Sequence, residues 1–304
     1  MKTAIVTGAN GFVGHALVKE LLNEGYRVFA AHREGSRHRL ADQPGLICIP
    51  FRLDAAAELE SRLSGCQGAD FYHLAWDGSA GPKRGDTNLQ LRNAQWTVEA
   101  LELAARLGCR RFIGAGTIME YETMAAAYAP ENRPGAGYIY GGGKLSAHVM
   151  CRCAAARLGI DLLWAQITNA YGPGELSPRL VNTTLRKCIQ GEAPQFTAGT
   201  QNYDFVYIDD VARAFRLIGE KGVPFRDYLI GSSHARPLRE FLLEMRSAVA
   251  PELEFRFGNV PFTGIDLPLS QFDCTRTEAD TGFRAQISFG EGCRRTIQWL
   301  KENG

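Results

Sequence analysis

The sequence predicts an α/β fold: a Rossmann-type doubly wound parallel sheet with a smaller, interleaved C-terminal lobe. Three observations predict it. Short β-branched apolar runs alternate with amphipathic stretches along the first half of the 304-residue chain. A glycine-rich turn directly follows the first of these runs. No low-complexity linker or internal repeat divides the chain. Strands that alternate with helices in this way form parallel sheets covered on both faces.

The predicted elements follow one another closely in the first half. Residues 3–6 form a strand, residues 7–14 a glycine turn, and the stretch with Leu17, Leu21 and Leu22 a helix. Further strands are expected at residues 26–31, 46–49, 70–75, 111–115 and 161–167, and helices at residues 55–63, 89–107 and after residue 140. Ligands of such sheets bind at the carboxyl ends of the strands.

The pattern changes after residue 170. Helices are expected at residues 180–189, after the segment 204–210, within 236–249 and up to Trp299. We therefore expect residues 1–170 to form a dinucleotide-binding domain with returning segments near 203–232, and residues 171–304 to form mainly a second, interleaved lobe for the substrate.

Composition narrows the class of partner. Lys and Arg number 34 and Asp and Glu 33, so the charge does not favour nucleic acid or a membrane surface. Gly8 and Asn10 interrupt the first apolar run too early for a signal peptide, and no run reaches the roughly 18 apolar residues of a membrane span. Eight cysteines without paired spacing indicate reduced thiols and no metal site. We expect a cytoplasmic protein with a small-molecule partner.

The glycine turn points to a dinucleotide. Gly8, Gly11 and Gly14 follow a strand and open a helix, together with Phe12 and Val13. Such a turn lets the backbone approach a pyrophosphate, which the free N–H groups and positive dipole end of the helix then bind. A triple-glycine pattern alone is weak evidence, but its place after the first strand strengthens it.

The second strand lacks the acidic residue that binds the ribose of NAD. His32 and Arg33 follow it instead, with Arg37 close behind, which favours the 2′-phosphate of NADP. The alternative is a solvated basic loop in an enzyme that uses NAD.

Tyr140 and Lys144 are the expected acid/base pair. Four residues apart on a helix, their side chains share one face. An ammonium group beside a phenol lowers its pKa and makes it a better proton donor and acceptor near neutrality. Such pairs also arise by chance. Glycine is unfavourable inside a helix, so the three glycines at residues 141–143 need an explanation. Either a ligand approaches the backbone closely there, or the residues belong to a frayed helix start.

With these pieces in place, the sequence resembles the extended short-chain dehydrogenase/reductase family, in its nucleotide-sugar epimerase/dehydratase branch. The resemblance spans nearly the whole chain. It rests on the order and spacing of the glycine turn, His73-Leu74-Ala75, Asn93, Thr117 four before Tyr121, Tyr140 and Lys144, Asn169-x-Tyr-Gly-Pro173, the Asp-Phe-Val-Tyr-Ile-Asp-Asp segment at 204–210, and the terminal Gly282-Phe283 and Trp299.

The resemblance implies roles for individual residues. Lys144 would hold the nicotinamide ribose and lower the pKa of Tyr140, Tyr140 would exchange a proton with the sugar oxygen, and Thr117 would hydrogen-bond that oxygen. The remaining coenzyme contacts would be Leu53, Leu74, Ala75, Asn93 and Ala115. The substrate, a nucleotide sugar, would contact Trp76, Asn169, Arg179, Leu180, Tyr203 and Arg276. The sequence leaves open whether the protein forms a homodimer.

Departures from the family pattern favour one reaction. Dehydratases of this branch place Asp-Glu after the threonine, where this chain has Ile118 and Met119. At two positions where the family usually has an arginine, this chain has Tyr203 and Gln166. Arg179 or Arg276 would then hold the pyrophosphate in their place. The leading hypothesis is an NADP-dependent reductase of a nucleotide-linked 4-keto sugar. The alternatives are a nucleotide-sugar 4-epimerase and a dinucleotide sensor without turnover.

Overall fold

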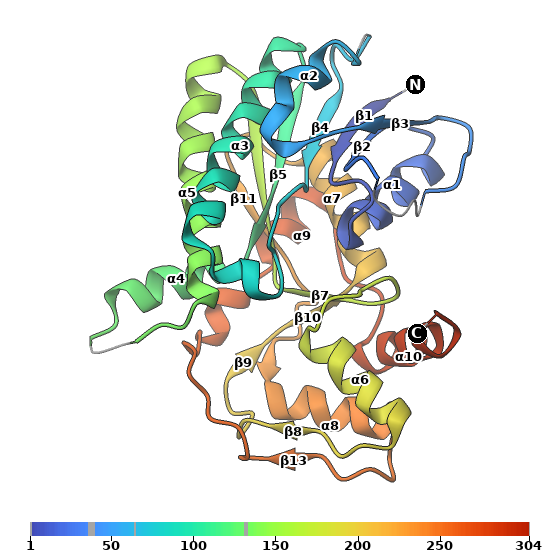
Figure 1. Cartoon of the computed structure of the whole chain (residues 1–304), viewed down its shortest axis with the longest axis vertical. Coiled ribbons are helices and arrows are strands. Elements are labelled where there is room, and N and C mark those ends of the chain that lie inside the picture. The colour runs from blue at the N-terminus through green and yellow to red at the C-terminus, as the bar shows by residue number, and fades with distance from the viewer. Residues whose placement is uncertain (1, 36–39, 64, 131–132, 304) are drawn as a thin grey trace.

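A seven-stranded parallel sheet forms the centre of the molecule (Figure 1). The computed structural model describes residues 2–35, 40–63, 65–130 and 133–303. The strand order is β3–β2–β1–β4–β5–β6–β11. The bounds are β1 Thr3–Thr7, β2 Arg27–His32, β3 Leu46–Pro50, β4 Asp70–His73, β5 Arg111–Thr117, β6 Asp161–Ile167 and β11 Asp227–Ile230. The predicted fold class is confirmed. The strand order reverses between β1 and β4, where such sheets bind ligands.

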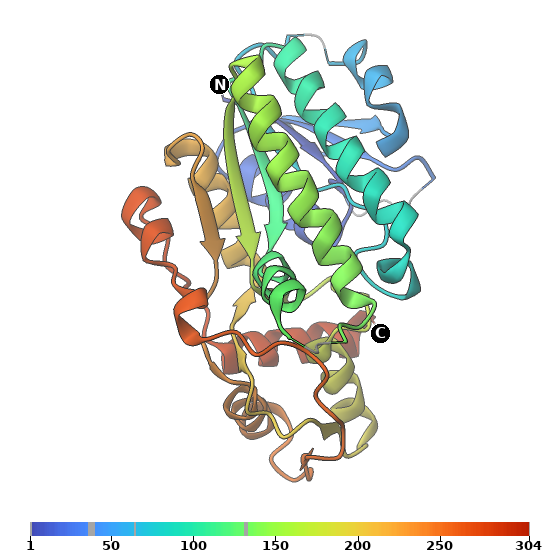
Figure 2. The same cartoon turned by 90° about the vertical axis from the view of Figure 1, so that its left-hand side faces the viewer.

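Helices cover both faces of this sheet (Figures 1 and 2). α1 (Phe12–Asn23) and α7 (Ile208–Lys221) pack together on one face, and α3 (Thr87–Arg106) and α5 (Gly137–Leu158) pack together on the other, with α2 (Ala56–Glu60) beside α3. Val6 belongs to the core cluster on one side of β1 and Ile5 to the cluster on the other. Alternate side chains of a strand face opposite ways, so a strand buried on both faces is apolar throughout.

The carboxyl ends of the strands face a smaller lobe (Figure 1). It contains α6 (Leu180–Gln190), α8 (Leu238–Val249) and α10 (Phe289–Asn303), with the strand pairs β7 (Asn169–Tyr171) with β10 (Phe205–Tyr207), β8 (Gln195–Phe196) with β13 (Arg256–Phe257), and β9 (Asn202–Tyr203) with β12 (Arg236–Pro237). An aromatic cluster of Tyr171, Phe205, Phe241 and Phe289 packs its core, with ring centroids 5.0–6.2 Å apart. The chain returns from this lobe to supply α7 and β11 to the main sheet.

Among the elements not predicted individually are α4 (Met119–Tyr128), β11, α9 (Thr275–Thr281) and the short strand pairs of the smaller lobe. α4 begins with two glutamates in its first turn and continues into three alanines, a composition that favours a helix. Short 3₁₀ turns lie at Leu53–Ala55, Pro82–Gly85 and Leu269–Phe272. Among the described helices, none is long and apolar enough to cross a membrane.

Candidate active site

The turn between β1 and α1 is compact because its glycines let backbone meet backbone. Gly8 has φ +70°, and a Cβ there would lie 2.7 Å from the Ala75 nitrogen. A Cβ on Gly14 would lie 2.1 Å from the Gly8 oxygen. Gly11, which has no side chain, is the N-cap of α1. The first N–H groups of this helix are therefore available to an anion, the arrangement that fits a pyrophosphate.

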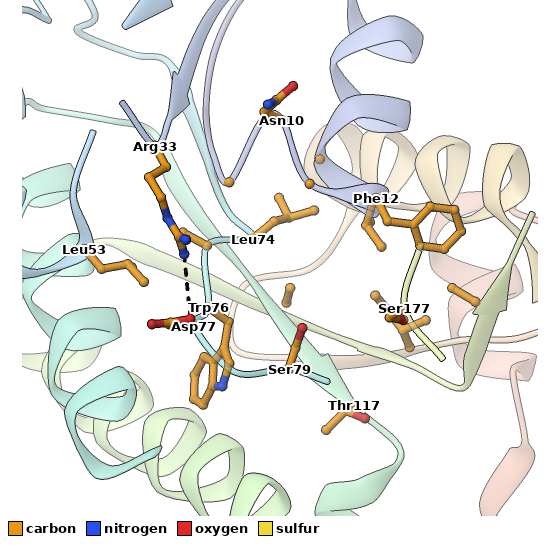
Figure 3. Close-up of a pocket in the computed structure, with 18 of the residues that line it drawn as sticks. Asn10, Phe12, Arg33, Leu53, Leu74, Trp76, Asp77, Ser79, Thr117 and Ser177 are labelled. Carbon is orange, nitrogen blue, oxygen red and sulfur yellow. Dashed lines mark ion pairs between the residues drawn. The ribbon is translucent and has the colours of Figure 1, made fainter. Parts of the chain in front are cut away.

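A cavity of about 740 Å³ extends from this turn across the ends of the strands (Figure 3). Its wall includes most residues predicted to bind the coenzyme: Gly8, Gly11, Phe12, Val13, Gly14, His32, Arg33, Leu53, Leu74, Ala75, Ala115, Tyr140 and Lys144. Arg37 lies outside the described residues. The glycine turn, the size of the cavity and the uncapped helix together fit a dinucleotide.

Asn93 lies outside the described wall of this cavity, and its contact with the coenzyme stays a prediction. Its side-chain nitrogen donates to the Asp77 oxygen at 2.8 Å, and its side-chain oxygen accepts from the Asp77 nitrogen at 3.0 Å. Asn93 is 1% exposed. Its role is to hold the loop after β4, because a buried amide must satisfy both its donor and its acceptor.

Charged side chains meet where β2 ends. Arg33 forms an ion pair with Asp77 at 3.7 Å (Figure 3). Lys83 lies 3.2 Å from the other oxygen of Asp77. Arg52, also in the cavity wall, pairs with Asp54 at 2.8 Å. Asp77, which follows Trp76 directly and lines the cavity, was not predicted as a site residue. Arg33 and Arg52 are thus each paired with a carboxylate, Asp77 and Asp54 respectively.

Tyr140, Lys144 and Thr117 meet at the other end of the cavity. The Lys144 ammonium donates to the Ala115 oxygen at 2.8 Å and lies 3.8 Å from the centre of the Trp76 ring. The Trp76 ring also meets Tyr140 edge-on, with centroids 6.0 Å apart. Burial lowers the pKa of Lys144 to about 7. Trp76 therefore contacts both members of the predicted acid/base pair.

The pKa of Tyr140 differs in cause and direction from the prediction. Burial raises it, and the opposing effects come first from the cations Arg179 and Arg84, then from a hydrogen bond with the Thr117 hydroxyl. The Arg84 guanidinium lies 4.8 Å from the centre of the Tyr140 ring. The Lys144 ammonium is directed at the Ala115 carbonyl, and the main positive charges acting on this pKa belong to two arginines distant in sequence, Arg179 and Arg84.

Gly141 and Gly143, two of the three glycines after Tyr140, serve helix packing. They lie inside α5, not at a frayed start. A Cβ on Gly141 would lie 2.0 Å from the Thr123 hydroxyl, and one on Gly143 would lie 2.9 Å from the Gln90 oxygen. Gly142 meets no atom within 4 Å. Two of the three glycines therefore let α4 and α3 approach the helix that carries Tyr140.

A second cavity of about 330 Å³ adjoins the first on the side of the smaller lobe. Thr117, Tyr140 and Arg179 line both cavities. Of the residues predicted to bind substrate, Asn169, Arg179, Leu180 and Tyr203 line the second cavity and Trp76 the first. Arg276 is exposed on α9 and lies outside the described walls of both, so its substrate contact stays a prediction.

Three charged residues of the second cavity, Arg84, Glu122 and Glu175, were not predicted. Arg84, from a 3₁₀ turn, stacks on Tyr140, and its Nε is buried without a hydrogen-bond partner. Glu122, from α4, has its pKa raised to about 7 by burial, against the charge of Arg84. The sequence signal was present in Met119-Glu-Tyr-Glu, which follows Thr117 closely, but no pattern linked it to a turn 35 residues earlier. Among the described residues no cluster suits a metal ion.

Comparisons with known proteins identify relatives that are NAD dependent enzymes, in agreement with a cavity that fits a dinucleotide. The model of the NAD dependent epimerase/dehydratase family matches residues 4–231. The chain is 25% identical to UDP-glucose 4-epimerase of Mycolicibacterium smegmatis, covering 98% of each chain, and 22% identical to dTDP-glucose 4,6-dehydratase of Streptomyces griseus, covering 98% of this chain and 94% of the other.

Solved structures show the same fold. The structure of MoeE5 in complex with UDP-glucuronic acid and NAD has a TM-score of 0.78 at 24% identity and covers 99% of this chain and 100% of that one. UDP-glucose 4-epimerase of Thermotoga maritima with UDP-glucose has a TM-score of 0.79 at 20% identity and covers 99% of each chain. The chain belongs to the NAD dependent epimerase/dehydratase family, within the extended short-chain dehydrogenase/reductase branch.

Proposed function

We propose that this protein is an NADPH-dependent reductase of a nucleotide-linked 4-keto sugar. The observation that carries the proposal is the placement of Thr117 and Tyr140 where the two cavities meet. A sugar in the smaller cavity would place its reacting carbon beside the phenol of Tyr140. A nicotinamide in the larger cavity would supply the hydride.

The residues of the junction suit proton transfer to a ketone oxygen. The Thr117 hydroxyl accepts from the Met119 nitrogen at 3.3 Å and hydrogen-bonds Tyr140, so it would link the phenol to the substrate oxygen. Tyr140 then donates a proton to that oxygen as negative charge develops there. Arg84 and Arg179 both lower the pKa of Tyr140, so they stabilise the phenolate that remains.

The neighbours of Thr117 support reduction over dehydration. Elimination of water needs a paired acid and base, and Ile118 and Met119 occupy the positions where dehydratases of the branch carry them. Glu122 is the acidic residue that α4 contributes to the described cavity wall, and the charge that acts on it there is that of Arg84.

A 4-epimerase is the second candidate, favoured by the match to UDP-glucose 4-epimerase over the whole chain. An epimerase regenerates its coenzyme within each cycle and gains by holding it tightly, whereas a reductase must exchange it. We expect the purified protein to carry little nicotinamide and to consume one NADPH per 4-keto nucleotide sugar, measured by absorbance. Copurified coenzyme, with interconversion of two nucleotide hexoses and no net absorbance change, would establish the epimerase instead.

Coenzyme preference gives a separate prediction. We expect NADPH to bind at least about tenfold more tightly than NADH, roughly 1.4 kcal/mol, because Arg33 can exchange its 3.7 Å pair with Asp77 for charge-assisted hydrogen bonds to the 2′-phosphate. Dissociation constants of both coenzymes, measured on wild type and Arg33→Ala, test this. The matched control is Arg106→Ala, whose exposed arginine pairs with Glu60 away from the cavity. Equal affinities in the wild type would show that the basic residues are only solvated.

A further inference from the structure

A buried carboxylate lies directly behind Thr117. Glu120 is 0% exposed, and its Oε1 accepts from the Thr117 backbone nitrogen at 2.8 Å. Trp164 and Gln166 on β6 donate to the same carboxylate, each at 3.2 Å. These neutral donors satisfy its lone pairs but supply no charge. A buried carboxylate without a cation is strongly unfavourable, so its counter-ion must be identified.

His148 is that counter-ion. Its Nδ1 lies 2.9 Å from Glu120 Oε2, and its Nε2 lies 3.0 Å from Asp227 Oδ1. When Glu120 and Asp227 are both carboxylates they only accept hydrogen bonds, so both ring nitrogens donate, and only the imidazolium can do so. The ring also stacks on Trp164, with centroids 4.7 Å apart and planes 6° from parallel. Burial opposes the charge, but hydrogen bonds to Asp227 and Glu120 outweigh it and raise the pKa of His148 to about 9.

His148 shares a helix face with the predicted catalytic residues. Tyr140, Lys144 and His148 are spaced four residues apart on α5, so they lie one above another toward the sheet. The ion pair therefore connects α5, which carries Tyr140, to the first turn of α4. Glu120 in that turn holds the backbone of Thr117 at the end of β5.

We propose that Glu120 and His148 are positioning residues, which hold Thr117 in register with Tyr140 through one buried ion pair. The inference rests on the proposed roles of Thr117 and Tyr140. Its geometry is independent of the substrate. The charged groups that face His148 are Glu120 from α4, Asp227 from β11, and on its own helix Lys144 and Arg152, the latter 3.2 Å from Asp227.

The sign of the pH dependence follows from this environment. The pKa of His148 in the folded protein, about 9, lies above the ordinary value of about 6.5. The stabilisation by the imidazolium is therefore complete below about pH 6.5 and is lost as the pH rises through about 9. The hydrogen bond from the Thr117 amide to Glu120 is expected to change over the same range.

Two variants and one control test the proposal. His148→Gln removes the charge, and Asp227→Asn weakens it from the half-exposed end, which keeps a folded protein available if the first variant unfolds. His234→Gln is the control, an exposed histidine outside both described cavity walls. Turnover is measured from about pH 6 to 9.5, and the Thr117 amide is followed by nuclear magnetic resonance with ¹⁵N-threonine, which needs no substrate.

We expect His148→Gln to lower kcat about tenfold with KM within about twofold, because a small misplacement of reacting groups costs rate more than binding. In Asp227→Asn the loss of kcat and the shift of the Thr117 amide should begin at a lower pH than in the wild type. An amide resonance unchanged across this range in the wild type, or an unchanged kcat in folded His148→Gln, overturns the proposal. If the wild type reduces no keto sugar, the proposed function fails, and the amide titration still decides this inference.

Discussion

Tyr140→Phe is expected to lower turnover by on the order of 100-fold or more while coenzyme affinity stays within about twofold, because positioned proton transfer typically contributes that much. The variant keeps the ring that contacts Trp76 and Arg84 and removes only the hydroxyl. Turnover with a 4-keto nucleotide sugar and the dissociation constant of NADPH are the measurements.

The matched control is Tyr128→Phe, which loses a hydroxyl from a side chain 88% exposed on α4. It should leave both quantities unchanged. If Tyr140→Phe turns over near the wild-type rate, another group donates the proton. Glu122 would then be examined first, because its pKa of about 7 suits an acid near neutrality.

Gly14→Ala is expected to weaken coenzyme binding by about 100-fold or more, roughly 2.7 kcal/mol. The added Cβ would lie 2.1 Å from the oxygen and 2.8 Å from the carbon of Gly8. These are backbone atoms, so the turn itself must move, and with it the N–H groups at the start of α1. Titration of the protein with NADPH and NADH measures the loss.

The control for this prediction is Gly142→Ala. This glycine also lies in a helix, but an added Cβ there meets no atom within 4 Å. We expect a gain of roughly 0.8–1 kcal/mol in the free energy of unfolding, the usual difference between the two residues in a helix, with unchanged coenzyme affinity. Gly14→Ala with wild-type affinity would show that the turn can shift without affecting the coenzyme.

Local patterns in the sequence were sufficient for the fold class and for the core of the site. The apolar run of β1, the glycine turn and the helix after it are each specified by neighbours in the chain, so their arrangement follows from backbone geometry. The same holds for Tyr140 and Lys144, because helical spacing alone places them on one face. They lie close to Thr117 because Thr117 ends β5 and the helix α5 that follows begins near the same edge of the parallel sheet.

Tertiary structure alone decided how this site is charged. Arg84 stacks on Tyr140, and His148 neutralises Glu120 and also contacts Asp227. These contacts join segments that are distant along the chain, and no local pattern encodes them.

Gly141 and Gly143 illustrate the same limit, since the atoms that a Cβ there would meet belong to Thr123 and Gln90, which lie on two other helices. The pKa of a buried group depends on every charge within a few ångströms and on its loss of water, and both are set by packing between elements rather than by order in sequence.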